Sequence, residues 1–440
     1  MPRVRSTTSL KSRLIKSNDK GSLQIRVSTM TSATSSPKQT HVESLLASAL
    51  PFLRGELQLI DPKLPSLTSV LKFAGAGECW HKHGTFLTHL LDVYRILKLW
   101  NAPDAVSLCG LFHSAYSNSY VNLAIFHPTT GRHEVLTHVG EQAERLIHLF
   151  CVVPRHSLIH DDLLFKYSEE ELARHVEESE VSITRCENGV WEKSEPWREK
   201  LGGLLPPGGV KVKHIKTGED VRVSRRMVAV FLLLTMADFS DQLFGFQDEL
   251  FENINGKLEF SSNNVAALWP GDGKPGLWLT SISKMGALYT LIAREERIFE
   301  CEGGVVNEEE IELVIPPIFD NCRRVLGAIE QIEARDLYWK AISGGGEWAE
   351  EALRGSIERN HFVGEPYVVL SQVLMGMGRF EEAEKMAERG LELILQWGSA
   401  WDKRISWEGW VAWGRVLLMK AKERAWPSTA FGILNLGLVQ

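Results

Sequence analysis

The stretch TFLTHLLDVYRILKLWNAPDAVSLCGLFHS, from Thr85 to Ser114, decides the fold. Its first half repeats apolar residues at helical spacing, which predicts an amphipathic helix over Thr85–Trp100. Asn101-Ala102-Pro103 then makes a tight turn, and the proline is well placed to open a second helix over Asp104–His113. The second helix is apolar almost all round, so we expect it to be buried.

Two histidines in this helix pair lie at matching heights. His89 stands 12 residues before Asn101, and His113 stands 10 residues after Pro103. At about 1.5 Å rise per residue, one helix climbs ~18 Å and the other descends ~15 Å. If the helices are antiparallel neighbours, the two imidazoles meet across the pair and could share a metal ion. Histidine is concentrated in this region, since 11 of the 14 lie between His81 and His175.

Helical patterns dominate the rest of the chain. Helices are predicted over His41–Leu53, Pro65–Phe73, Arg132–Phe150, Glu169–Glu180 and Arg226–Gln242. Residues 184–224 look like an insertion, because glycine and proline clusters mark loops there. Within it, VKVKHI and VRVS alternate with period two, which predicts a β-hairpin. The sequence therefore predicts a mainly α fold with a small β-hairpin insertion.

The C-terminal part carries a weak helical repeat. PYVVLSQVLMGMGRFEEAEKMAERGLEL, residues 366–393, resembles a tetratricopeptide hairpin. Small residues that would let its two helices approach closely are Ser371, Ala383 and Gly390. Asp336–Glu358 and Trp407–Glu423 look like degenerate neighbours, which are expected because a lone hairpin cannot bury its own face. Trp407, Trp410 and Trp413 share one helical face, which favours core packing over an aromatic groove for a peptide.

The order of several short motifs resembles the HD superfamily of metal-dependent phosphohydrolases. These motifs are His81-Lys82-His83-Gly84, AVSLCGLFH at residues 105–113, HVGEQAERLIHLF at residues 138–150 and LLLTMADFSDQL at residues 232–243. Within that superfamily the likeness is greatest to the hydrolase domain of guanosine tetraphosphate hydrolases. The resemblance covers roughly residues 80–245 and is interrupted by the insertion. The whole arrangement also resembles an uncharacterised plant and algal family whose HD-like core carries His-Ser.

The resemblance implies that His89, His113 and Asp238 are metal ligands. Where the family has an aspartate directly after the second histidine, this sequence has Ser114, and Ser117-Asn118 replaces the acidic pair that follows. Two imidazoles and one carboxylate can still hold Zn²⁺ or Fe²⁺ with open positions, whereas Mn²⁺ prefers anionic oxygen ligands. The expected cofactor is therefore either none, with a metal-free polar pocket, or one divalent metal (Mn, Fe or Zn).

Polar residues around the two histidines are candidate contacts to a phosphorylated ligand. They are Lys82, His83, Ser114, Tyr116 and Asn118. The alternative for each is an exposed or merely polar loop residue. Asp92, one helical turn from His89, either supplies a missing carboxylate or lies at the surface.

We therefore expect a degenerate HD-like domain that binds a phosphorylated small molecule or a protein partner without hydrolysing it. Loss of the carboxylates weakens any mechanism that needs a metal-activated water beside a general base. The tetratricopeptide-like domain would be the interaction arm. The alternative is a metal-dependent phosphohydrolase that acts on a nucleotide-like phosphate ester through His89, His113 and Asp238.

Domain boundaries follow from these patterns. Residues 1–40 form a tail, residues 42–250 the HD-like domain with its insertion at 184–224, and residues 251–314 a connecting segment. Residues 315–427 form the tetratricopeptide-like domain, and residues 428–440 a second tail.

Composition excludes several classes of partner. The net charge of −7 leaves no broad basic field for nucleic acid, and no run of about 18 apolar residues predicts a membrane span. The six cysteines are scattered, which argues against a zinc ribbon and suits a reducing compartment. The first 40 residues hold eight Lys/Arg and one acid among many Ser and Thr, a composition typical of transit peptides. We expect a chloroplast location, with a mitochondrial address or a cytoplasmic protein with a disordered tail or a start at Met30 as alternatives.

Overall fold

The fold is organised around the helix pair predicted over residues 85–114. Helix α4 spans Phe86–Leu99 and helix α5 spans Asp104–Leu111. Asn101 turns the chain between them with a φ of 57°, a left-handed conformation that asparagine tolerates better than most residues. A Cβ atom at Gly110 would lie 2.3 Å from Cδ1 of Leu97, so the glycine allows the two helices to pack closely.

The computed structural model describes residues 41–81, 84–120, 124–128, 130–190, 195–242, 244–250, 273–304, 311–321, 326–344 and 348–436. The N-terminal tail therefore lies outside the described residues, as do residues 251–272 and 305–310 of the expected connecting segment at 251–314. The described part is mainly helical, with two small two-stranded sheets, which confirms the predicted fold class. None of its helices is both long and apolar enough to cross a membrane.

Three helices and a short ribbon precede α4. They are α1 (His41–Leu53), α2 (Leu57–Ile60), α3 (Leu64–Phe73), and the antiparallel strands β1 (Trp80–His81) and β2 (Gly84–Thr85). Thr85 is the last residue of β2 and caps α4, because its hydroxyl accepts a hydrogen bond from the backbone N–H of Thr88 at 3.2 Å. The ribbon is thereby joined to the start of the helix that carries His89.

The predicted helix over Arg132–Phe150 is two helices. α6 spans Gly131–Val139 and α7 spans Glu141–Val152. Gly140 separates them with a φ of +85°, a conformation open to glycine and closed to most other residues. The apolar periodicity continues on both sides of the break, and the pattern alone therefore predicts one continuous helix.

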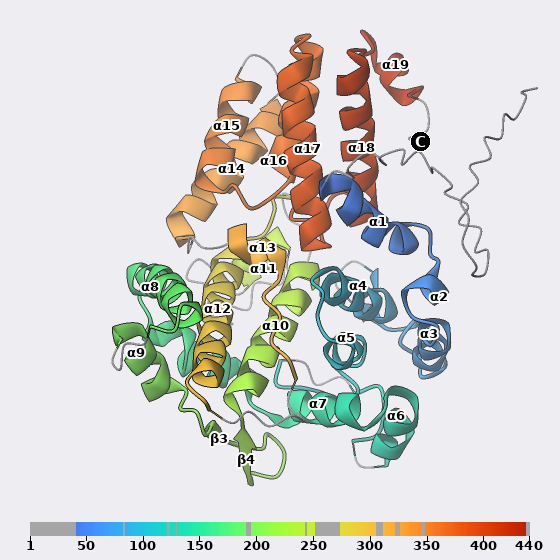
Figure 1. The fold of residues 1–440 in the computed structure, drawn as a ribbon. Coiled ribbons are helices and arrows are strands. Elements are labelled where there is room, and N and C mark those ends of the chain that lie inside the picture. Colours follow the sequence, from blue (N-terminus) through green and yellow to red (C-terminus); the bar gives the residue numbers. More distant parts are fainter. Residues whose placement is uncertain are drawn as a thin grey trace, which may run out of the picture. The chain divides into compact units, whose positions relative to one another are not determined.

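The middle of the chain contains the predicted hairpin and the long helix that completes the core. Its elements are the π-helix η1 (Ser157–Asp161), the 3-10 helix η2 (Leu164–Lys166), α8 (Glu169–Glu187), α9 (Pro196–Leu204), β3 (Val210–Lys213), β4 (Asp220–Val223), α10 (Arg225–Gln242), α11 (Gly245–Leu250), α12 (Leu279–Cys301) and α13 (Pro317–Asn321). α8 extends beyond the predicted end at Glu180, because Ser182 and Cys186 continue its buried face. α10 packs on α4, α5 and α12, so it lies at the centre of these helices (Figure 1).

The C-terminal part is a series of packed helices. They are α14 (Ala328–Gly344), α15 (Ala349–Arg359), α16 (Glu365–Gly376), α17 (Phe380–Trp397), α18 (Trp407–Glu423) and the short α19 (Ala430–Leu434) (Figure 1). The α16–α17 hairpin uses small residues at its contact, where the Ser371 hydroxyl donates a hydrogen bond to the Ala383 carbonyl at 2.8 Å. Trp407 and Trp410 are buried and Trp413 is partly buried, so this face of α18 is core.

Contacts join the C-terminal helices to the helix that carries His89. The indole N–H of Trp100, just after α4, donates to the Gln396 carbonyl at 3.0 Å. The Arg95 guanidinium on α4 donates to the Gly398 carbonyl at 3.0 Å and pairs with Glu408 on α18. The two parts of the chain that the sequence separates into domains are therefore in direct contact in the structure.

Candidate metal centre

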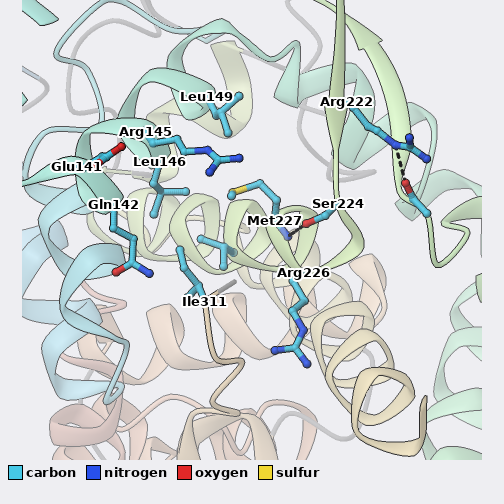
Figure 2. Close-up of a pocket in the computed structure, with 12 residues that line it drawn as sticks. Glu141, Gln142, Arg145, Leu146, Leu149, Arg222, Ser224, Arg226, Met227 and Ile311 are labelled. Atoms are coloured by element: carbon cyan, nitrogen blue, oxygen red, sulfur yellow. Dashed lines mark hydrogen bonds between the residues drawn. The ribbon is translucent and has the colours of Figure 1, made fainter. Parts of the chain in front are cut away.

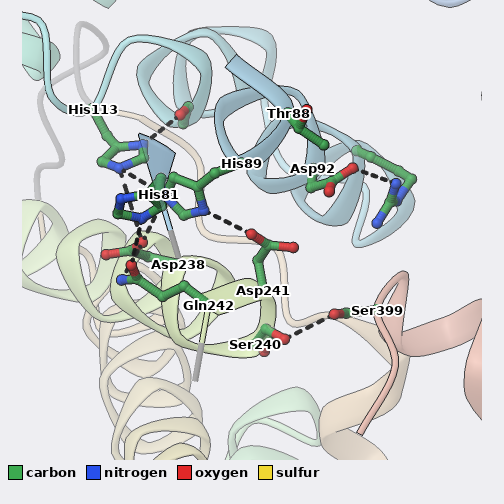
Figure 3. Close-up of polar contacts among 12 residues, drawn as sticks. His81, Thr88, His89, Asp92, His113, Asp238, Ser240, Asp241, Gln242 and Ser399 are labelled. Carbon is green, nitrogen blue, oxygen red and sulfur yellow. Dashed lines mark hydrogen bonds and ion pairs between the residues drawn. The ribbon is translucent and has the colours of Figure 1, made fainter. Parts of the chain in front are cut away.

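Three buried side chains converge where α4, α5 and α10 meet. His89 comes from α4, His113 follows the end of α5, and Asp238 comes from the last turns of α10 (Figure 3). His89 Nε2 lies 3.3 Å from His113 Nε2 and 3.2 Å from Asp238 Oδ1. His113 Nε2 lies 3.9 Å from the same oxygen. The structure thus brings together the three residues that the family resemblance implies as ligands.

The other nitrogen of each imidazole is held by a separate partner. His89 Nδ1 lies 2.7 Å from Asp241 Oδ2, and His113 Nδ1 lies 2.7 Å from the Gly110 carbonyl oxygen. Both partners are acceptors, so each Nδ1 carries the donated proton and each Nε2 faces Asp238. Metal-binding histidines are oriented in this way, by a carboxylate or a carbonyl behind the ring.

The three side chains of the cluster differ in how their surroundings shift their pKa values. Burial opposes the charge on His89, but hydrogen bonds to Asp238 and Asp241 outweigh it and raise the pKa of His89 to about 9. Burial lowers the pKa of His113 to about 4. Burial alone would raise the pKa of Asp238, yet the two histidines hold it well below its usual range. At neutral pH the His89 ring is therefore protonated. Its positive charge lies between His113 and Asp238, in the place where a cation would also fit.

Two of the three donor-atom separations are close to those around a small tetrahedral ion. Bonds of about 2.0–2.1 Å to nitrogen and oxygen ligands give ligand-to-ligand edges of about 3.3–3.4 Å in a tetrahedron. Two of the three separations in the structure, 3.2 and 3.3 Å, are close to these edges, and the third, between His113 Nε2 and Asp238 Oδ1, is longer at 3.9 Å. The donor set of two imidazoles and one carboxylate is also one that Zn²⁺ or Fe²⁺ accepts with further positions open. The residues present therefore fit a divalent cation.

A hydrogen-bonded pair covers the centre from the β1–β2 side. His81 Nε2 lies 3.0 Å from Gln242 Oε1, and Gln242 Nε2 donates to Asp238 Oδ1 at 2.7 Å (Figure 3). The His81 ring stands 4.6 Å from the His89 ring. The cavity left beside these residues measures about 10 Å³, which holds about one water molecule. A ligand of nucleotide size would reach the centre only if this cover moved.

The predicted ligand contacts after His113 are bonded to one another and to α7. Asn118 Nδ2 donates to the Ser114 hydroxyl at 3.0 Å, and the Tyr116 hydroxyl donates to Glu144 at 3.0 Å. Ser114, Tyr116 and Asn118 are all buried. Lys82 and His83 lie outside the described residues.

Three residues of the site were not identified from the sequence. Asp241 and Gln242 follow Asp238 by three and four positions on α10, a helical spacing that places all three on one face. That spacing is visible in ADFSDQ and could have identified them. Asp92 does not join the ligand atoms and instead pairs with Arg95 on its own helix.

The third is Arg155, a fully buried cation beside the centre. Its Nε donates to the Phe150 carbonyl at 2.8 Å and its Nη1 to the Thr235 hydroxyl at 3.3 Å. Its charge contributes to the low pKa of Asp238. Nη2 has no hydrogen-bond partner among the described residues. No sequence pattern marks this arginine, because its partners come from α7 and α10.

We expect Asp241→Asn to weaken binding of Zn²⁺ by about 10- to 100-fold, because the amide loses the charge that polarises and orients His89. Competition with a chromophoric zinc chelator measures the affinity. Asp92→Asn is the matched control, since Asp92 lies on the same small cavity but bonds to Arg95. Equal affinities of Asp241→Asn and the wild type would show that Asp241 does not support the centre.

Part of the chain is similar to a known protein family. A family model described as a domain of unknown function, DUF6817, matches residues 70–155. This span contains α4, α5 and α7, and with them His89 and His113 but not Asp238. No curated protein and no solved structure matches the chain significantly. The helix pair is therefore similar to a family to which no function is assigned.

Proposed function

We propose that this chain is a non-hydrolytic HD-like protein that holds one divalent cation, Zn²⁺ or Fe²⁺, and binds a phosphorylated small molecule beside it. The observation that carries the proposal is the buried convergence of His89 Nε2, His113 Nε2 and Asp238 Oδ1 at separations of 3.2–3.9 Å. When bound, such an ion would supply positive charge and Lewis acidity to an anionic oxygen.

Arg155 supports the choice of a phosphorylated ligand. The guanidinium is fully buried, and no carboxylate among the described residues forms an ion pair with it. The charge of nearby Asp238 and the Phe150 ring, whose centroid lies 3.4 Å away, offset the desolvation only in part, because burial still lowers the pKa of Arg155. Its unpaired Nη2 is a strong donor for an anionic oxygen. An anion that reached Arg155 would receive a charge-assisted hydrogen bond in an environment of low dielectric constant.

The residues around His113 support binding without hydrolysis. The Ser114 hydroxyl is neutral and accepts the Asn118 amide hydrogen, so it replaces the expected carboxylate poorly. Glu144 is the acid in contact with this loop, and Arg132 pairs with it at 2.7 Å. Burial alone would raise the pKa of Glu144, but the hydrogen bond from Arg132 outweighs it and lowers that pKa. A paired carboxylate of this kind is a weak general base.

Elemental analysis of the purified chain, together with a nucleotide-phosphate hydrolysis screen, tests the proposal. We expect one equivalent of zinc or iron, no turnover, and binding of inorganic phosphate that weakens about tenfold or more in Arg155→Gln. Arg155→Lys, which keeps the charge, should retain most of the affinity. Turnover that disappears in His113→Ala would instead establish the phosphohydrolase alternative, and absence of metal would refute the proposal.

A separate prediction concerns the residue after His113. We expect Ser114→Asp to bind a divalent metal about tenfold more tightly, because a second carboxylate near the ion adds an opposite charge in a buried site. Ser114→Ala removes the hydroxyl without adding charge, and its metal affinity should equal that of the wild type. Calorimetric titration with Mn²⁺, the ion that gains most from an anionic oxygen, measures the difference. Unchanged affinity in Ser114→Asp would show that Ser114 is not what separates this site from those of the hydrolases.

A further inference from the structure

A second cavity lies along α10, the helix that carries Asp238, but nearer to the N-terminus of that helix. It measures about 630 Å³ and opens between α7, the N-terminal half of α10 and the β3–β4 hairpin (Figure 2). Val230 is the lining residue of α10 nearest to Asp238, and the eight positions between them correspond to about 12 Å along the helix. The three ligand residues and the side chains that hold them do not line this cavity. The cavity is therefore a separate feature.

The floor of the cavity is apolar. Leu146, Leu149, Met227, Val230 and Ile311 form it. Leu149 and Met227 are only partly buried, so their side chains leave apolar surface facing the cavity. The volume lies within the range of about 300–1,000 Å³ that is usual for small-molecule sites. Shape and lining together fit an organic molecule with an apolar group.

The rim of the cavity is cationic. Arg145 extends from α7 toward the side of Met227, and Arg222 comes from the β4 strand (Figure 2). Within the described part of the chain, neither arginine has a carboxylate partner. Arg222 Nε donates to the Gly208 carbonyl at 2.9 Å, which fixes the guanidinium and leaves its outer nitrogens available. Two unpaired guanidinium groups above an apolar floor are suited to a carboxylate or a phosphate.

The other charged residues of the described lining change the positive charge at the rim only a little. Arg226 pairs with Glu296 at 2.9 Å and with Glu300, so α12 already compensates its charge. Among the described lining residues Glu141 is the one carboxylate, and it is exposed. The chain as a whole carries a net charge of −7, so no general field attracts anions to it. The described lining of this cavity therefore carries a local excess of arginine within an acidic chain.

We propose that this cavity binds an amphipathic organic anion, with its acyl or aryl group on the Leu149–Met227 floor and its carboxylate or phosphate between Arg145 and Arg222. The apolar group and the charge both contribute to affinity, so neither a neutral chain nor a bare anion binds well alone. The metal centre takes no part in this binding. The inference thus goes beyond the proposed function and stands or falls separately from it.

Isothermal titration of the full chain with four probes tests the site. The probes are dodecanoate, dodecyl phosphate, dodecan-1-ol and inorganic phosphate. Below their micellar concentrations, we expect dodecanoate or dodecyl phosphate to bind at least tenfold more tightly than dodecan-1-ol at one saturable site. The ratio of the two anionic affinities shows whether the natural head group is a carboxylate or a phosphate. Wild-type protein that binds neither anion, or that binds dodecanoate and dodecan-1-ol equally, would overturn the proposal.

Two variants test separately how the arginine rim and the apolar floor contribute to binding. Arg145→Gln/Arg222→Gln should weaken binding of the anionic probes at least tenfold and leave the weak dodecan-1-ol affinity unchanged. Met227→Trp, which fills the floor, should abolish binding of all three chains. Arg174→Gln/Arg297→Gln is the matched control, because these arginines are about 60% exposed on α8 and α12 and do not line the cavity. Unchanged dodecanoate affinity in the rim variant would place the site elsewhere.

Asp238→Asn distinguishes this inference from the proposed function. We expect it to lose the metal and to keep the full affinity for dodecanoate. If dodecanoate binding disappeared with the metal in a folded Asp238→Asn protein, the anion would depend on the metal centre, and the separate site would be refuted.

Discussion

Protein in which His113 is replaced by alanine should contain no bound divalent metal, whereas the wild type should contain one equivalent. The substitution removes the nitrogen that lies 3.3 Å from His89 Nε2 and leaves one imidazole and one carboxylate. Loss of a residue behind a ligand already costs about 10- to 100-fold in metal affinity, so loss of a ligand itself should exceed that. Elemental analysis after gel filtration measures the metal content.

Two further variants keep this result interpretable. His113 is buried and packs against Phe150, so His113→Ala also leaves a cavity. Asp238→Asn conserves volume and should lose the metal as well, with a circular dichroism spectrum like that of the wild type. His133→Ala, on the exposed side of α6, should retain the full equivalent. A metal content of one equivalent in both His113→Ala and Asp238→Asn would place the ion outside this cluster.

Gly364→Ala should destabilise the C-terminal helices by about 3 kcal/mol, the upper end for overpacking of a close contact. α16 and α17 cross where Gly364 meets Gly390. A Cβ atom at Gly364 would lie 2.3 Å from the Gly390 carbonyl oxygen and 2.6 Å from Ile394 Cγ1. The first neighbour is backbone, so relief requires the two helices to separate. We expect the midpoint of thermal unfolding to fall by several degrees.

Gly376→Ala provides the matched control at the other end of α16. A Cβ atom there would meet nothing within 4 Å, and alanine favours a helix over glycine by about 1 kcal/mol. Its unfolding midpoint should therefore equal or exceed that of the wild type. Equal midpoints for Gly364→Ala and Gly376→Ala would show that the helices do not cross at this close distance.

The elements that local spacing determines could be predicted from the sequence. The turn at Asn101 and the apolar periodicity on both sides define α4 and α5 to within two residues. The equal heights of His89 and His113 follow from the same spacing, because an antiparallel helix pair converts distance along the chain into position. The α18 helix likewise has the predicted bounds, Trp407–Glu423.

What depends on contacts between distant segments could not be predicted in this way. The Asp241 carboxylate holds a histidine 152 positions earlier in the chain, and the Trp100 indole bonds to a carbonyl 296 positions later. Arg155 looks like an ordinary loop arginine until the fold buries it. The break at Gly140 was missed for a different reason, because glycine is tolerated within a helical pattern and only the backbone angle shows that it ends one.

The cover made by His81 and Gln242 has a consequence for the rate at which an ion would exchange. Gln242 forms hydrogen bonds to both His81 and Asp238, so the cover is hydrogen-bonded to one of the ligand residues. Release of an ion would require these hydrogen bonds to break. The dissociation half-time would then be set by the rate at which the cover opens rather than by the strength of the metal bonds. An ion acquired during synthesis would accordingly persist through purification, and dilution into chelator would remove it slowly.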